Sequence, residues 1–395
     1  MARAIILVMD SLGIGGAKDA AEYNDEGADT LGHIIDNYPN LKIPNLTKLG
    51  LLQAANEASA SNRKVAFDDS KIEINSKFGF CNEVSLAKDT TSGHWEITGV
   101  PVVKPWGYFR PEYPSFPDEL MQKICKIAKI DGFLGNRAAS GTEIIKELGE
   151  EHIKTGKPIA YTSADSVFQI AAHEKYFGLQ KLYDLCEIAF KELEPYRIAR
   201  VIARPFVGEE KDNFIRTGNR HDYSVSPFDD TLLDVVKAAG KDVFAVGKIS
   251  DIFAGCGVTQ KLPASGHDAL WKTTLKIIKE APEESLIFTN FVDFDMLYGH
   301  RRDLQGYAKA LEDFDEKLPL LIDSLRENDV VFITADHGND PTAKGTDHTR
   351  ERVPVLMFGK NVKSENIGER QTFSDIGQTA AEVLGLKISK GKSFL

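Results

Sequence analysis

Cysteine is scarce in this sequence, and the few cysteines present lie far apart. Four occur in 395 residues, and no two of them form a Cys-x-x-Cys pair: Cys81, Cys125, Cys186 and Cys256. Disulfide frameworks and thiolate zinc sites both need clustered cysteines, so the sequence predicts neither. Scattered reduced thiols are typical of the cytoplasm, and we expect a cytoplasmic protein.

Long hydrophobic runs and an excess of basic residues are also missing. The first apolar stretch ends at Asp10, too early for the core of a signal sequence. No run approaches the roughly 20 apolar residues that span a bilayer. Lysine and arginine number 48 against 59 acids, a net charge of −11, whereas nucleic-acid-binding surfaces are rich in Lys and Arg. We therefore expect no membrane and no nucleic acid as partner, and no obligate protein partner is evident.

What the sequence does contain is a series of short apolar runs separated by amphipathic stretches. The runs are Ile5–Met9, Ile159–Tyr161, Val201–Ala203, Val243–Val246, Leu286–Phe291, Val330–Thr334 and Val353–Phe358. Helical periodicity occurs over Asp230–Ala239, Ala269–Ala281, Gly306–Leu325 and Ser374–Leu384. Strands that are apolar throughout are buried on both faces, and their alternation with helices predicts an α/β fold with a parallel sheet.

The composition changes in the middle of the chain. Prolines cluster among aromatic residues between 101 and 117, and a second loop-like stretch covers 216–227. Such segments are typical of crossings between domains. We therefore predict a core formed by residues 1–101 and 225–395, with a smaller α/β domain inserted over residues 102–224.

Acidic and imidazole side chains follow three of the expected strands. Asp10 ends the first strand, Asp295 follows Leu286–Phe291, and Asp336 and His337 follow Val330–Thr334. In open α/β sheets this carboxyl edge is where ligands bind. Carboxylate and imidazole without thiolate suit Mn2+, Zn2+ or Mg2+. A single histidine is more often a surface residue than a metal ligand. To explain all these residues as surface residues, acids or histidines would have to follow each of the three strands by chance, so we favour a metal site.

Two further segments allow two interpretations each. Lys88–Glu96 is rich in hydroxyl groups, which either cap a helix or supply a nucleophile that a metal or base must activate; the pattern alone favours the cap. Arginines at 200, 204, 216 and 220 accompany a polar stretch over 161–166. Guanidinium groups suit phosphate oxygens, although solvated surface arginines are more common.

Several familiar nucleotide-binding and sulfatase patterns are absent. Gly391-Lys392-Ser393 resembles the end of a P-loop, but Gly385 is one residue out of register. The glycines after the first strand do not form Gly-x-Gly-x-x-Gly, which disfavours a dinucleotide fold. The Cys/Ser-x-Pro-x-Arg motif of sulfatases is absent from the sequence, so a sulfatase is less favoured.

Longer motifs occur in order along nearly the whole chain: Asp10–Gly15, Asp29–His33, Lys88–Glu96, Ala139–Glu143, Tyr161–Ser166, Gly218–Tyr223, Gly247–Asp251, Asp293–Asp303 and Asp336–Arg350. Together they make the sequence similar to the phosphopentomutases of the alkaline phosphatase superfamily. Gly-His-Trp-Glu and Gly-Asn-Arg-His-Asp-Tyr are far more specific signals than the scattered Asp and His of the superfamily. The resemblance implies an α/β, alkaline-phosphatase-like core with a mainly parallel sheet flanked by helices, and the inserted domain as a cap.

The resemblance also implies a set of site residues. It places two Mn2+ ions in the chain, one held by Asp295, His300 and His348 and the other by Asp10, Asp336 and His337. The nucleophile position falls on Thr90. Positions that contact the substrate fall on Ser163, Asp165, Arg200, Arg216 and Lys248. Every metal position carries the residue that the family pattern requires.

The implied activity is that of an isomerase for pentose phosphates. Ribose 1-phosphate or 2-deoxyribose 1-phosphate would be interconverted with the corresponding 5-phosphate, through a phosphothreonine and a sugar 1,5-bisphosphate that also acts as activator. The reaction would serve nucleoside catabolism and salvage. A plain phosphomonoesterase and a cofactor-independent phosphoglycerate mutase share the same metal core and remain alternatives. A non-catalytic sugar-phosphate-binding protein would lack the nucleophile or a ligand, whereas all these positions are filled.

Overall fold

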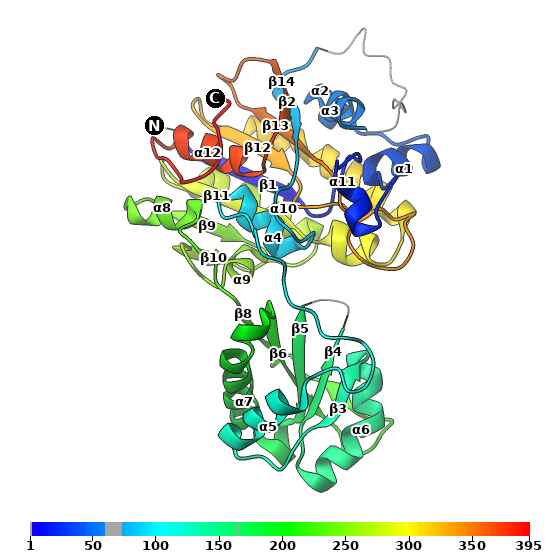
Figure 1. Ribbon diagram of the computed structural model, residues 1–395. Helices are drawn as coiled ribbons and strands as arrows, with labels where there is room; N and C mark the ends of the chain where they lie inside the picture. The colour runs from blue at the N-terminus through cyan, green and yellow to red at the C-terminus, as the bar shows by residue number, and fades with distance from the viewer. Residues whose placement is uncertain (1, 60–72, 164–165) are drawn as a thin grey trace. The chain divides into compact units, whose positions relative to one another are not determined.

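The computed structural model describes residues 2–59, 73–163 and 166–395. The chain forms two compact units, Met1–Lys104 with Ser226–Leu395, and Pro105–Val225 (Figure 1). The sequence predicts an insertion over residues 102–224, and the second compact unit covers nearly the same span. A backbone hydrogen bond of 2.9 Å from Leu232 N to Thr98 O joins the two segments of the first unit close to where the second unit leaves and rejoins.

The first unit is built on one large sheet. Among the described residues this sheet has eight strands in the order β10-β9-β11-β1-β12-β13-β2-β14. The strands are β1 (Ala4–Met9), β2 (Lys77–Cys81), β9 (Val243–Val246), β10 (Gln260–Leu262), β11 (Leu286–Phe291), β12 (Val330–Thr334), β13 (Val353–Phe358) and β14 (Glu365–Arg370). Every residue of β1, β11, β12 and β13 is buried, as their apolar sequences predict.

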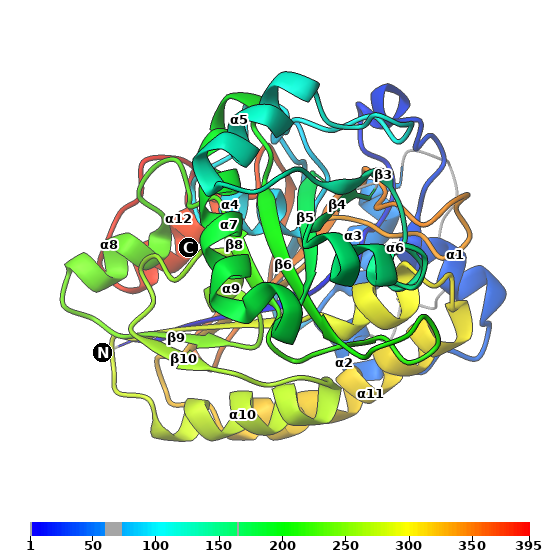
Figure 2. The ribbon, with the colours of Figure 1, turned by 90° about the horizontal axis from the view of Figure 1, so that it is seen from below.

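Helices cover both faces of this sheet. The set comprises α1 (Thr30–Asn37), α2 (Pro44–Lys48), α3 (Leu51–Ala58), α4 (Thr90–Ile97), α8 (Leu232–Ala238), α9 (Ile249–Ile252), α10 (His267–Glu280), α11 (Leu304–Asp323) and α12 (Ser374–Val383). Helices α10 and α11 pack against each other along one side of the core (Figure 2). Helix α12 contacts β1, β12, α4 and α8. The sheet is therefore the middle layer between helices, the predicted fold class.

The direction of one strand differs from the expectation. β13 pairs with β12 and with β2 in antiparallel fashion, whereas the five strands from β10 to β12 in the sheet order are parallel to one another. An apolar run shows that a strand is buried on both faces but not which way it runs. The sheet is mainly parallel, with β13 as the exception.

The second unit has its own sheet and its own core. Its described strands run in the order β3-β4-β5-β6-β7, and β8 also pairs with β6. They are β3 (Leu134–Ala138), β4 (Ile159–Thr162), β5 (Val167–His173), β6 (Arg200–Val207), β7 (Ile215–Arg216) and β8 (His221–Ser224). Helices α5 (Asp118–Ala128) and α7 (Leu179–Glu192) cover one face, and α6 (Gly141–Thr155) packs with Ile159, Ala171 and Phe206 on the other.

In the parts of the chain that the structure describes, no helix is long and apolar enough to cross a membrane.

A buried ion pair fixes the amino ends of β1 and β12. Arg3 Nε donates to Asp329 Oδ1 at 2.9 Å, and both side chains are almost fully buried. The same guanidinium donates to the backbone oxygens of Ile278 and Ala281 at the end of α10. Burial alone would raise the pKa of Asp329, but the hydrogen bonds from Arg3 and from Arg326 N outweigh it, so the pKa lies below its ordinary value.

We expect Asp329→Ala to lower the free energy of unfolding by about 3–5 kcal/mol, because the Arg3 charge stays buried without its partner. Denaturant titration measures this loss. Asp313→Ala is a matched control, since its ion pair with Lys309 is exposed and should contribute about 1 kcal/mol at most. Because the pKa of folded Asp329 is lowered, its stabilisation is present at neutral pH and is lost as the pH falls below about 4. Equal losses in the two variants would contradict this role.

Candidate metal centre

Three adjacent parallel strands deliver the candidate ligands to one edge. The strands β11, β1 and β12 are neighbours in that order, and they pair in parallel. Asp10 follows β1, Asp336 follows β12, and Asp295 lies in a short π-helical turn, η5 (Phe294–Gly299), after β11. Because parallel strands end at the same edge, these side chains meet although they are far apart in sequence.

The first ligand group is completely buried. Asp10, Asp336 and His337 are each 0% exposed, and their ligand atoms lie within 4.8 Å of one another. His337 Nε2 is 3.5 Å from Asp10 Oδ1 and 3.4 Å from Asp336 Oδ2. The structure therefore brings together the whole set that the family resemblance assigns to one ion.

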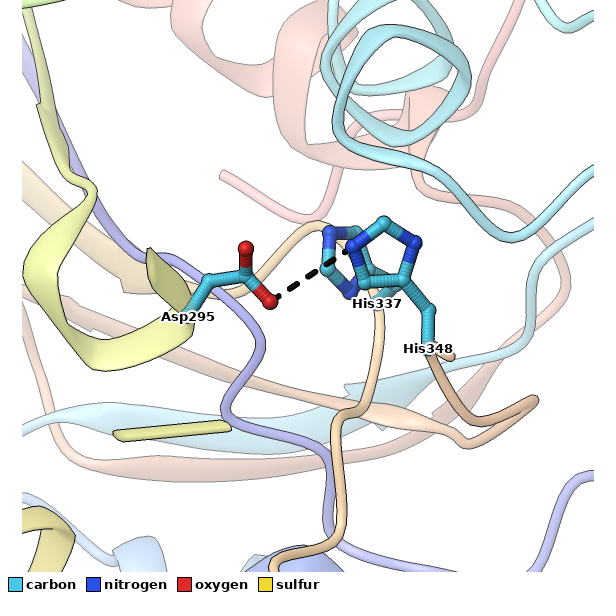
Figure 3. Close-up of side chains that lie close together, drawn as sticks. All are labelled: Asp295, His337 and His348. Atoms are coloured by element: carbon cyan, nitrogen blue, oxygen red, sulfur yellow. Dashed lines mark ion pairs between the residues drawn. The ribbon is translucent and has the colours of Figure 1, made fainter. Parts of the chain in front are cut away.

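The second group surrounds Asp295. Its carboxylate lies 3.1 Å from His300 Nε2 and 3.5 Å from His348 Nε2. The ring centroids of His337 and His348 are 4.1 Å apart. Figure 3 shows both imidazoles beside the Asp295 carboxylate. Asp295, His337 and His348 also satisfy the spacing of a ligand group. His337 thus lies between the two groups, which form one continuous cluster.

The hydrogen bonds of the histidines suit metal ligation. His337 Nδ1 lies 3.0 Å from Gly338 O, and His300 Nδ1 lies 2.6 Å from Thr346 O. A carbonyl oxygen can only accept, so each Nδ1 carries a proton, and each Nε2 is the ring nitrogen that faces the carboxylates and can ligate a metal. Asp10 Oδ1 is buried and has no hydrogen-bond partner among the described residues. The donor set therefore fits divalent cations with oxygen and nitrogen ligands.

The electrostatics of the cluster also favour a cation. Burial, followed by the charges of Asp336 and Asp295, raises the pKa of Asp10 well above its ordinary value, while the Lys248 charge opposes this shift. Burial also raises the pKa of Asp295, but His348 and His300 outweigh it and hold that pKa low. Burial lowers the pKa of His337, so this imidazole is neutral at pH 7. Bound positive charge would relieve the repulsion among the three carboxylates.

Thr90 stands at the amino end of α4, facing the cluster. Its Oγ1 lies 3.2 Å from His337 Nε2. Asp89 caps the helix, because its carboxylate accepts from the backbone N–H groups of Thr91 and Ser92 and from the Ser92 hydroxyl. The segment does cap a helix, as the first interpretation predicts, but through the Asp89 carboxylate and not through a hydroxyl group. This does not exclude the other interpretation, because the cap leaves the Thr90 hydroxyl directed at the candidate ligands.

Sequence reasoning missed two polar residues behind the ligands. Asn290 Nδ2 donates to Asp10 Oδ2 at 2.7 Å and lies 3.2 Å from His94 Nε2. His94 Nδ1 lies 3.0 Å from Asp336 Oδ2 and 2.8 Å from Thr90 O. Both side chains are fully buried. A carboxamide inside the mainly apolar strand β11 was the available signal for Asn290.

The predicted substrate residues fall in both units. Lys248 is the residue before α9 in the first unit, and its charge acts on Asp10. Ser163, Arg200 and Arg216 belong to the second unit, where Arg200 Nη1 lies 3.3 Å from Asp222. Asp165 lies outside the described residues.

Comparisons with known proteins identify the family of this chain. A family model described as the metalloenzyme superfamily matches residues 2–388. The fold and the ligand cluster thus define a metalloenzyme of the alkaline phosphatase type. The PH0037 protein from Pyrococcus horikoshii has a similar fold, with a TM-score of 0.50 at 14% identity over 99% of both chains.

The sequence relatives are more specific. The chain is 62% identical over 398 residues to the phosphopentomutase of Elusimicrobium minutum and 55% identical over 404 residues to that of Aeromonas salmonicida, in each case covering 100% of both chains. The chain belongs to the phosphopentomutase family. It is therefore a phosphosugar mutase, which is an isomerase.

We expect Asn290→Leu to weaken metal binding about 10- to 100-fold, because Asp10 loses the donor that orients it. Titration of the purified chain with Mn2+ against a competing chelator measures the affinity. Asn361→Leu is the control, since the Asn361 side chain donates only to exposed groups, Glu327 O and Asn328. Unchanged affinity in a folded Asn290→Leu variant would show that Asn290 does not orient the ligand.

Proposed function

We propose that this chain interconverts ribose 1-phosphate or 2-deoxyribose 1-phosphate with the corresponding 5-phosphate. The observation that carries the proposal is the Thr90 hydroxyl, 3.2 Å from His337 Nε2 within a buried cluster of metal-type ligands, in a chain 62% identical to a phosphopentomutase. We assign the reaction to nucleoside catabolism and salvage in the cytoplasm, with small pentose phosphates as partners.

Two Mn2+ ions are the proposed cofactor. Asp295, His300 and His348 would hold one ion, and the group of Asp10, Asp336 and His337 the other. Bound there, the ions would supply the positive charge that stabilises the attacking and leaving oxygens of an in-line phosphoryl transfer. The family membership and the convergence of these six side chains support this assignment.

Thr90 is the proposed carrier of the phosphoryl group. In the first step the phosphorus–oxygen bond of phosphothreonine breaks, a new bond forms to the C5 hydroxyl of ribose 1-phosphate, and the hydroxyl proton passes to Thr90. In the second step Thr90 takes the C1 phosphoryl group of the 1,5-bisphosphate, and its proton passes to the C1 oxygen. The amino end of α4 favours negative charge on Thr90 throughout. A supply of sugar 1,5-bisphosphate would activate chains that have lost the phosphate.

The inserted domain, predicted over residues 102–224, is proposed to bind the sugar phosphate. Arg200 and Arg216 would contact the phosphate that is not transferred, Asp165 and Ser163 would bind the sugar, and Lys248 of the core would add a further positive charge. Charge-assisted bonds of this kind hold a sugar hydroxyl in place of water, which the same site would otherwise activate. This selection separates a mutase from a phosphatase.

The direct test incubates the chain with ribose 1-phosphate and Mn2+ and follows ribose 5-phosphate and free phosphate together. We expect ribose 5-phosphate to form with little free phosphate. Arg200→Ala should lose about ten- to hundredfold in transfer while releasing a larger fraction of phosphate to water. Release of phosphate without isomerisation would indicate a phosphomonoesterase, and turnover of phosphoglycerates a phosphoglycerate mutase.

Removal of metal should abolish the activity. We expect treatment with a chelator to stop turnover and added Mn2+ to restore it, because the ligands cluster around sites that need positive charge. Asp336→Ala and His348→Ala should bind less Mn2+, as measured by metal analysis of the purified chain. Full activity of either variant in chelator would disprove the metal assignment.

The phosphoryl group should be found on Thr90. After incubation with a sugar 1,5-bisphosphate, peptide mass spectrometry is expected to place one phosphate on this residue, and Thr90→Ala should not isomerise ribose 1-phosphate. Thr91→Ala is the matched control and should retain phosphorylation. Phosphate on Thr91 or Ser92, with Thr90→Ala active, would identify a different nucleophile.

A further inference from the structure

Within the second unit, two arginines lie near the amino end of helix α6 without a carboxylate partner. Arg204 is on β6 and Arg216 is on β7. Arg204 Nε donates to Gln169 Oε1 at 3.1 Å, which orients its guanidinium. Among the described residues, neither arginine forms an ion pair with an acid, whereas Arg137 in the same unit is paired with Glu147.

The hydroxyl group of Tyr161 on β4 is buried close to these arginines. The side chain is 1% exposed, and its oxygen has no hydrogen-bond partner of normal geometry in the part of the chain that is described. Burial raises the pKa of Tyr161, and the charges of Arg204 and Arg216 oppose that rise without removing it, so the hydroxyl keeps its proton. Buried polar groups are almost always satisfied, so this donor needs a partner that it can reach.

These groups converge on the first residue of α6. A methyl group added to Gly141 would lie 2.6 Å from the Tyr161 hydroxyl and 3.3 Å from Arg216 Nη1. Ser140, the residue before the helix, makes no capping hydrogen bond to the backbone, and its hydroxyl lies 3.0 Å from the Thr142 hydroxyl. The first N–H groups of a 15-residue helix and its positive dipole end thus face the same small space.

The charges at this place repel one another. Burial lowers the pKa of Arg204, and the neighbouring positive charges of Arg220 and Arg216 lower it further, while Tyr161 and the Asp222 carboxylate only partly oppose this shift. Like charges held together in a partly buried place are stable when an anion lies between them. A phosphate dianion offers several terminal oxygens, enough to accept from two guanidinium groups, a phenol and a helix amino end at once.

We propose that Tyr161, Arg204, Arg216 and the amino end of α6 form a binding site for a phosphate monoester dianion. The identity of the ligand rests on the proposed function, which makes it the phosphate of the pentose phosphate that is not transferred. Arg216 is already expected to contact the substrate. Tyr161, Arg204 and α6 are new members of the site, and they make it specific for a phosphate in place of a neutral sugar.

The first experiment measures binding of ribose 5-phosphate, inorganic phosphate and ribose to the full chain by calorimetry. We expect both phosphates to bind and ribose not to bind measurably. Arg204→Gln should weaken ribose 5-phosphate binding about 10- to 100-fold and raise KM by a similar factor. Lys191→Gln removes a charge from the same unit on α7, where the side chain is exposed and paired with Glu187, and it should change neither value.

Two further variants separate binding from folding. Tyr161→Phe removes a buried hydroxyl that donates to no described acceptor, so the unliganded chain should keep or raise its Tm while losing much of the stabilisation that ribose 5-phosphate gives. Gly141→Ala removes no charge but places a methyl group in the site, and it should weaken binding while alanine sustains the helix. A Tyr161→Phe or Gly141→Ala chain that binds ribose 5-phosphate as the parent does would overturn the proposal.

The outcomes also distinguish this site from the proposed function. If the chain binds phosphate through Arg204 but does not isomerise ribose 1-phosphate, the phosphate site is supported and the proposed function is wrong. If the chain isomerises ribose 1-phosphate, and the Arg204→Gln and Tyr161→Phe variants have the same KM as the parent, the proposed function is supported and the phosphate site is wrong.

Discussion

Mutual repulsion among Asp10, Asp295 and Asp336 is the constraint around which the first unit is organised. The three carboxylates are at most 6% exposed, and they meet because β11, β1 and β12 are adjacent and parallel. Buried acids are expensive unless hydrogen bonds or cations compensate them. Ser11 N, Asn290 and Asn339 each donate to one of the three, and the imidazoles supply the remaining contacts. These groups hold the three carboxylates in place, so the site already favours a positive charge in the absence of a ligand. Electrostatic stabilisation of phosphoryl transfer depends on such a preorganised site.

Much of this organisation could be predicted from the sequence, because the signal for a buried strand and the signal for the ligands at its end are both local. An apolar run followed by Asp or Asp-His marks a buried strand and the chemistry at its end, and all seven predicted runs are strands in the structure. The alkaline-phosphatase-like fold was predicted for the same reason, with support from the family motifs. The antiparallel direction of β13 was not predictable, since pairing direction depends on how the chain returns and not on the composition of the strand.

The residues that support the site were harder to predict. His94 and Asn290 join Asp336 to Asp10 through contacts between α4 and β11, 196 positions apart in sequence. Strands such as β5 were missed because Gln169 and His173 interrupt their apolar pattern. The same Gln169 orients Arg204, so a polar residue that weakens the sequence signal is one that the structure uses. Local patterns thus locate ligands at strand ends, while the groups that orient them depend on tertiary packing.

The hydrogen bond between Leu232 N and Thr98 O has a consequence for how this architecture can change. It joins the segments on either side of residues 105–225, and no described strand of the large sheet comes from those residues. The register of the large sheet therefore does not depend on the inserted sequence. Closing the remaining gap with a short linker would cost little chain entropy. The insertion is in this sense an exchangeable module, and lineages that share the metal-binding scaffold could acquire new substrates by replacing it without rebuilding the scaffold.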